Sequence, residues 1–88
     1  MPLISQFYGI LIRMFFKDTE QHHIPHFHAV YGEFEASYTM EGDVLAGNLP
    51  KKQNKLVVAW AALHYDELVA LWKVTQEEET FFTIKGLE

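Results

Sequence analysis

The sequence contains no cysteine. Disulfide bonds and thiolate metal ligands are therefore excluded, and any metal site must use histidine and carboxylate side chains. The absence of cysteine also fits a protein of the reducing cytoplasm.

Long apolar runs are absent as well. The stretch LVVAWAAL at residues 56–63 falls far short of the roughly 18 residues that span a bilayer. The opening stretch MPLISQFYGILIRMFF lacks the basic segment of a secretory signal, and Arg13 interrupts it. We therefore expect a soluble, cytoplasmic protein with no membrane partner.

Positive charge is scarce, since 7 Lys and Arg stand against 12 Asp and Glu, for a net charge of −5. Nucleic-acid binders gain much of their affinity by neutralising phosphates, so this balance disfavours a nucleic-acid partner without excluding one. Lys51, Lys52 and Lys55 form a local basic group at the start of an expected helix. A solvated helix face is the simpler interpretation of these lysines, and an anion site for phosphate or RNA is the alternative.

The 88 residues, 49% of them hydrophobic, are enough for one small globular domain over residues 1–88. The first half of the chain has the alternation typical of strands. We expect a first strand over residues 7–17, two strands over 26–31 and 34–40 that turn at Gly32 and Glu33, and a short edge strand at 44–47. In the strand over 34–40, alternation predicts that the inward side chains are Phe34, Ala36, Tyr38 and Met40.

The second half of the chain has the three- and four-residue spacing of a helix that begins near Pro50. One apolar stripe contains Leu56, Val57, Trp60, Leu63, His64, Leu68, Leu71 and Trp72. Asp66 is a good N-cap residue and predicts a kink or break there, while residues 80–88 suggest a weak last strand. We therefore predict an α+β fold, with a small antiparallel sheet of three to four strands packed against one long or broken C-terminal helix.

Four of the five histidines lie in the stretch HHIPHFHA. His26 and His28 are two apart on an expected strand, so their side chains share one face, and the short loop lets His22 approach them. Three imidazoles with an open fourth position would suit a hydrolytic zinc centre. A functional site without metal and a structural role in hydrogen bonding are the other interpretations.

Two further residues are candidates for this cluster. Arg13 lies within an expected strand and should either pair with Glu33 or Glu35 or hold an anionic ligand near the histidines. His64 lies on the apolar stripe, where a hydrogen-bonded core histidine is the simpler expectation. His64 would join the site if the helix packed over the face of His26 and His28.

Several motifs together resemble the bacterial domain-of-unknown-function family 4160 over residues 1–72. They are MPLISQFYGILIRMFFKD, PHFHAVYGEFEA, GNLP and WAALHYDELVALW. The family pattern, roughly His-x-Pro-Pro-His-Phe-His, maps onto His22, Pro25, His26, Phe27 and His28, with Ile24 in place of the first proline. The helix pattern maps onto Trp60, His64, Glu67, Leu68 and Trp72. His23 falls outside the pattern, which puts its role in doubt.

The resemblance implies no established activity. It does imply a frequent gene neighbour that encodes another small domain of unknown function, as in a toxin–antitoxin-like or regulatory pair. We therefore expect a non-catalytic binding module that meets a protein partner or a second copy through the edge at 44–47 or through the C-terminal segment. The alternative is a small metal-assisted hydrolase or nuclease that uses His22, His26 and His28 with a divalent metal such as zinc. No nucleophile or base stands out, so enzymatic activity stays open.

Overall fold

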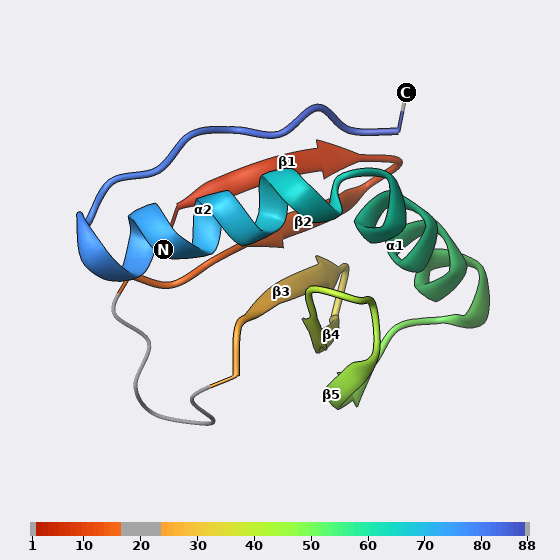
Figure 1. The fold of residues 1–88 in the computed structure, drawn as a ribbon. Helices are drawn as coiled ribbons and strands as arrows, with labels where there is room; N and C mark the ends of the chain where they lie inside the picture. Colours follow the sequence, from red (N-terminus) through yellow and green to blue (C-terminus); the bar gives the residue numbers. More distant parts are fainter. Residues whose placement is uncertain (1, 17–23, 88) are drawn as a thin grey trace.

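The computed structural model describes residues 2–16 and 24–87. Five antiparallel strands form one sheet in the order β1-β2-β3-β4-β5, and both helices pack on one face of it (Figure 1). The elements are β1 (Leu3–Phe7), β2 (Ile10–Arg13), β3 (His26–Tyr31), β4 (Phe34–Thr39), β5 (Val44–Asn48), α1 (Lys51–Leu63) and α2 (Tyr65–Glu77). The α+β class is confirmed. Within the described ranges, no helix is both long and apolar enough to cross a membrane.

The first expected strand is in fact a hairpin, so the prediction of one strand over residues 7–17 was wrong. Tyr8 and Gly9 have φ angles of 48° and 78°, and two left-handed residues in succession make the tight turn that joins β1 to β2. A Cβ atom at Gly9 would lie 3.3 Å from Tyr31 Cε1, so the turn also packs closely on that ring. The extra strand brings the sheet to five strands instead of three or four.

The remaining strands lie close to their predicted positions. β3 and β4 form the expected hairpin, and β5 is the expected edge strand. Ala36, Tyr38 and Met40 are buried as alternation predicts, but Phe34, which begins β4 beside the turn, is 42% exposed. Alternation therefore predicted the inward face correctly except at its end.

The helical segment is broken at His64, two residues before the predicted N-cap at Asp66. The backbone N–H of His64 donates to Trp60 O (3.0 Å) and closes α1, while His64 O accepts from Leu68 N–H (2.9 Å) and opens α2. Its φ of −115° and ψ of 25° turn the chain between the helices. Two helices of 13 residues each thus replace one long helix.

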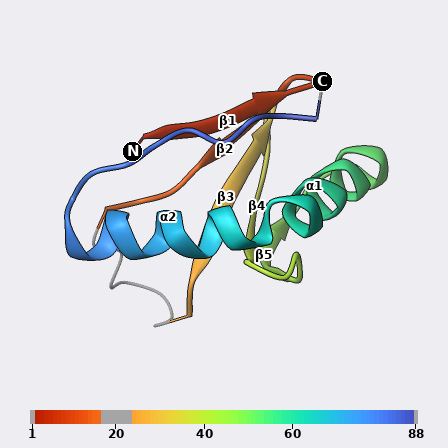
Figure 2. The same ribbon diagram turned by 45° about the horizontal axis from the view of Figure 1, so that its top comes forward.

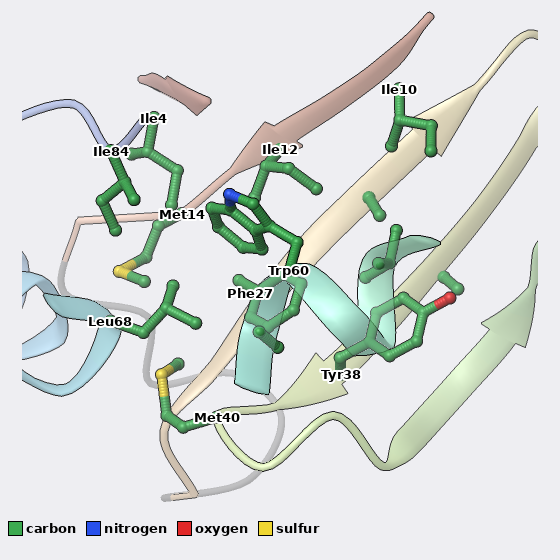
Figure 3. Packing of buried hydrophobic residues seen from close by; sticks show 14 of the residues in the cluster. Ile4, Ile10, Ile12, Met14, Phe27, Tyr38, Met40, Trp60, Leu68 and Ile84 are labelled. Atoms are coloured by element: carbon green, nitrogen blue, oxygen red, sulfur yellow. The ribbon is translucent and has the colours of Figure 1, made fainter. Parts of the chain in front are cut away.

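The core lies between the sheet and the helices, with Trp60 near its centre (Figure 3). Its ring lies 5.5 Å from that of Phe7 and 5.6 Å from that of Phe27, measured between centroids. The predicted stripe is confirmed at Trp60, Leu68 and Leu71, which are fully buried, but Leu63 is 72% exposed because it ends α1. Burying large side chains of this kind contributes roughly 1.5–3 kcal/mol each.

The C-terminal segment runs along β1 and forms no strand over residues 80–87, contrary to the prediction (Figure 2). Ile84 N–H donates to Ile4 O (2.7 Å), and the Ile84 side chain is buried. A Cβ atom at Gly86 would lie 2.7 Å from Gln6 O, so the segment approaches the β1 backbone closely. The segment therefore covers the backbone edge of β1, while its Phe81 and Phe82 side chains are exposed.

Candidate functional site

The sheet register places four of its residues in one cross-strand row. Arg13 of β2 lies opposite His28 of β3, His28 lies opposite Ser37 of β4, and Ser37 lies opposite Ala46 of β5. Residues that pair directly across antiparallel strands share a face of the sheet. This row lies on the face opposite Phe27, whose side chain belongs to the core under the helices.

The imidazoles of β3 form a cluster with two aromatic rings. The ring centroids of His26 and His28 are 5.3 Å apart, so both side chains lie on one side of the sheet, as strand alternation requires. The Phe15 ring lies 4.5 Å from that of His28, and the Trp72 ring of α2 lies 5.3 Å from that of His26. We call Phe15, His26, His28 and Trp72 the imidazole–aromatic cluster.

His26 and His28 differ in accessibility. His26 is 2% exposed, and its Nδ1–H donates to Ile24 O (2.8 Å), which leaves Nε2 without the proton in the neutral ring. His28 is half-buried, and its Nδ1 lies 3.8 Å from Glu35 Oε2. Since the Glu35 side chain is 61% exposed, solvent screens this pair and its contribution to stability is small. His28 is therefore the more exposed histidine of the cluster, with its Nδ1 toward Glu35 and its Nε2 buried.

A hollow of about 280 Å³ opens beside His28 next to the sheet edge. We call it the edge hollow, and it is lined by His28, Glu35, Ala36, Ser37, Ala46 and Gly47. Gly47 has a φ angle of +70°, and a Cβ atom added to it would lie 2.2 Å from Glu35 O. This position therefore requires glycine. The edge hollow thus has a backbone wall with an imidazole, a carboxylate and a hydroxyl around it.

The β5 strand forms the open edge of the sheet. Among the residues that the structure describes, only β4 pairs with it, whereas the C-terminal segment covers the opposite edge at β1. Its sequence, VLAGN, carries neither charge nor proline, the usual protection of an exposed edge. Four of its five residues are exposed, and a bulge at Leu45 is its one irregularity of pairing with β4.

The structure brings Arg13, His26 and His28 together but places His64 elsewhere. His64 Nδ1 lies 2.5 Å from Glu67 Oε1, and its ring lies 5.7 Å from that of Trp60. α2 reaches His26 through Trp72, whereas the contacts of His64 are with Glu67 and Trp60 at the helix junction. His64 is therefore hydrogen-bonded as the simpler expectation has it, but it is a half-buried residue of the helix junction and not a core histidine.

The predicted zinc ligands cannot be assembled from the described part of the chain. His22 lies outside the described residues, so its predicted approach to His26 stays a prediction. Within residues 2–16 and 24–87, no group of three His, Asp or Glu side chains stands close enough to hold a metal ion. The hydrolytic zinc site therefore depends on His22.

Sequence reasoning missed several residues of this region. Ser37 and Ala46 join the row only through the cross-strand register, and Trp72 reaches the cluster from a helix. Gly47 carried a usable signal, because a glycine within a strand often marks a bulge or a close backbone approach.

Comparison with protein families gives one match. The family model described as Domain of unknown function (DUF4160) matches residues 9–73, which reach from the β1–β2 turn into α2. No curated protein and no solved structure matches the chain.

Proposed function

This chain belongs to the DUF4160 family, and we propose that it is a non-catalytic binding module that recognises an extended segment of a protein partner at the β5 edge. The observation that carries the proposal is the asymmetry of the two sheet edges. The chain covers its own β1 edge with residues 80–87 and leaves the uncharged β5 edge open. An open edge offers a row of backbone donors and acceptors to an incoming strand.

The edge hollow supplies selectivity in this proposal. When an extended segment adds to a sheet edge, main-chain hydrogen bonds give affinity and pockets for alternate side chains give specificity. The edge hollow lies against β5 through Ala46 and Gly47, on the face to which every second side chain of an added strand would point. Its Glu35 carboxylate favours a lysine or arginine of the partner at that position.

A partner protein fits this edge better than a second copy of the chain. A symmetric antiparallel pairing of two β5 strands about Ala46 would set the bulged Leu45 opposite the left-handed Gly47 of the other copy. Both irregularities would then interrupt one short ladder. Glu41 and Asp43, in the turn that precedes β5, carry negative charge that a second copy would bring to the same edge.

We further propose that the partner is the product of the neighbouring gene, so that the two proteins form a regulatory or toxin–antitoxin-like pair. The gene arrangement that the family resemblance implies supports this assignment. The alternative, a metal-assisted hydrolase or nuclease, needs His22 as a third metal ligand. One bound zinc ion per chain in the untagged protein would support that alternative over the binding module.

The test is the affinity of the neighbouring gene's product for matched variants, measured by titration calorimetry. Val44→Lys places a charge on the open edge, while Val69→Lys changes a valine of similar exposure on α2. We expect Val44→Lys to weaken binding at least about tenfold and Val69→Lys to leave it within about twofold. Likewise, Glu35→Lys should weaken binding and Glu77→Lys should not. Equal affinity of Val44→Lys and the wild type would exclude the β5 edge as the binding site.

A further inference from the structure

A second concave region lies at the end of the molecule where the β1–β2 turn meets α1. One hollow of about 410 Å³ is lined by Tyr8, Tyr31, Lys52, Gln53 and Leu56. Another, of about 610 Å³, is lined by Lys51, Lys52, Lys55 and Leu56. Because they share Lys52 and Leu56, we treat them as one region and call it the tyrosine–lysine hollow. Each of the two hollows by itself has a volume in the range of small-molecule sites.

The aromatic side of this hollow comes from the two strand ends. Tyr8 is the first residue of the β1–β2 turn and is 54% exposed. Tyr31 lies at the end of β3 and is half-buried, with its ring against Gly9 of the same turn. Two tyrosines on separate elements thus line one side of the hollow. Aromatic rings of this kind are platforms for stacking a nucleobase.

The basic side of the hollow comes from α1. Lys51, Lys52 and Lys55 are exposed, and the residues that line the hollow include no aspartate or glutamate. Three of the 7 basic residues of an acidic chain are therefore gathered beside the two tyrosines. Lysine ammonium groups bind phosphate as point charges.

We propose that the tyrosine–lysine hollow binds a nucleotide unit, with the base on Tyr8 and Tyr31 and the phosphate on the three lysines. An acidic peptide would use the lysines without needing two aromatic rings, so the tyrosines favour a nucleotide. The same chemistry is present in a free nucleotide and in single-stranded DNA or RNA. The site is separate from the β5 edge, since the two share no lining residue.

The test follows chemical shifts of the full chain by NMR during titration with inorganic phosphate, AMP, and ten-residue oligoadenylate or oligothymidylate. We expect AMP or an oligonucleotide to shift the signals of Tyr8, Tyr31 and Lys52 and to bind at least about tenfold more tightly than phosphate. If the oligonucleotides bind more tightly than AMP, and the salt dependence of their affinity corresponds to about two released counterions, the natural ligand is single-stranded DNA or RNA. Tighter binding of AMP identifies a free nucleotide.

Two variants separate the two halves of the site without threatening the fold. Tyr8→Asn removes the ring while keeping a residue that suits the left-handed turn, and its control is Tyr65→Asn on α2. Lys52→Glu with Lys55→Glu removes the basic side, and its control is Lys73→Glu. Each site variant should weaken nucleotide binding at least about fivefold, and the controls should not change it.

Three results would overturn the proposal. The first is the absence of shifts at Tyr8, Tyr31 and Lys52 with millimolar AMP and with both oligonucleotides. The second is equal affinity for phosphate and AMP together with no preference for the oligonucleotides. The third is unchanged nucleotide affinity in the Tyr8→Asn protein.

Discussion

The indole N–H of Trp60 donates to the backbone carbonyl oxygen of Lys85 at 2.9 Å. This bond joins the C-terminal half of α1 to the segment that runs along β1, and its two residues lie 25 apart in the sequence. Trp60 thus fills the core and also helps to hold the cover of one sheet edge in place.

We predict that Trp60→Ala lowers the free energy of unfolding by roughly 3–5 kcal/mol, because it removes a fully buried aromatic ring. Trp60→Phe keeps much of the volume but leaves Lys85 O without its donor, so its loss should be smaller, about 1–3 kcal/mol. Urea denaturation followed by circular dichroism measures both values. Near-wild-type stability of Trp60→Ala would show that the Trp60 ring does not hold the core together.

The backbone of β5 gives a second prediction, from a matched pair of glycines. At Gly32, with a φ of +59°, an added Cβ meets nothing within 4 Å, so Gly32→Ala should cost only the conformational penalty of roughly 1–2 kcal/mol. At Gly47, an added Cβ would in addition lie 2.2 Å from Glu35 O. Gly47→Ala should therefore be clearly the more destabilising substitution in thermal unfolding. Equal losses would mean that β5 does not approach β4 as closely as the structure has it.

Burial of Tyr38 predicts a loss of stability at alkaline pH. Desolvation raises the pKa of its hydroxyl above the ordinary value, and the hydroxyl donates to Asn54 Oδ1 at 2.7 Å. The folded state therefore holds this proton more tightly than the unfolded state. The stabilisation is complete below pH of about 10 and is lost as the pH rises through the two pKa values.

The measurement is the free energy of unfolding between pH 8 and pH 11 for the wild type and for Tyr38→Phe. The variant should lose about 1 kcal/mol at pH 8 with the hydrogen bond. Its stability should then fall less steeply than that of the wild type above pH 10. Parallel curves for the two proteins would contradict the assignment of this pH dependence to Tyr38.

Sequence patterns predicted the β3–β4 hairpin and the buried helix stripe because each has a clear period. They failed at Tyr8 and Gly9, where the turn lies within an apolar run. A single strand would put Phe7 and Ile10 on opposite faces, whereas a two-residue turn pairs them and buries both.

For the candidate site, the pattern placed His26 and His28 on one face, and their ring distance agrees. The pattern did not predict the edge hollow, because the bulge at Leu45 and the close approach of Gly47 arise from the pairing of β4 with β5. The tyrosine–lysine hollow likewise joins Tyr8 to Lys52, which are distant in sequence and meet only in the fold.

Binding of an extended partner segment at the open edge is the central claim, and backbone hydrogen exchange tests it most directly. Amide exchange would be measured by NMR for the free protein and for its complex with the neighbouring gene's product. Pairing at the edge must slow the exchange of outward-facing amides within Val44–Asn48, while amides of β1, whose edge the C-terminal segment already covers, should exchange at unchanged rates. A complex in which the amides of Val44–Asn48 exchange as fast as in the free protein would contradict the proposal.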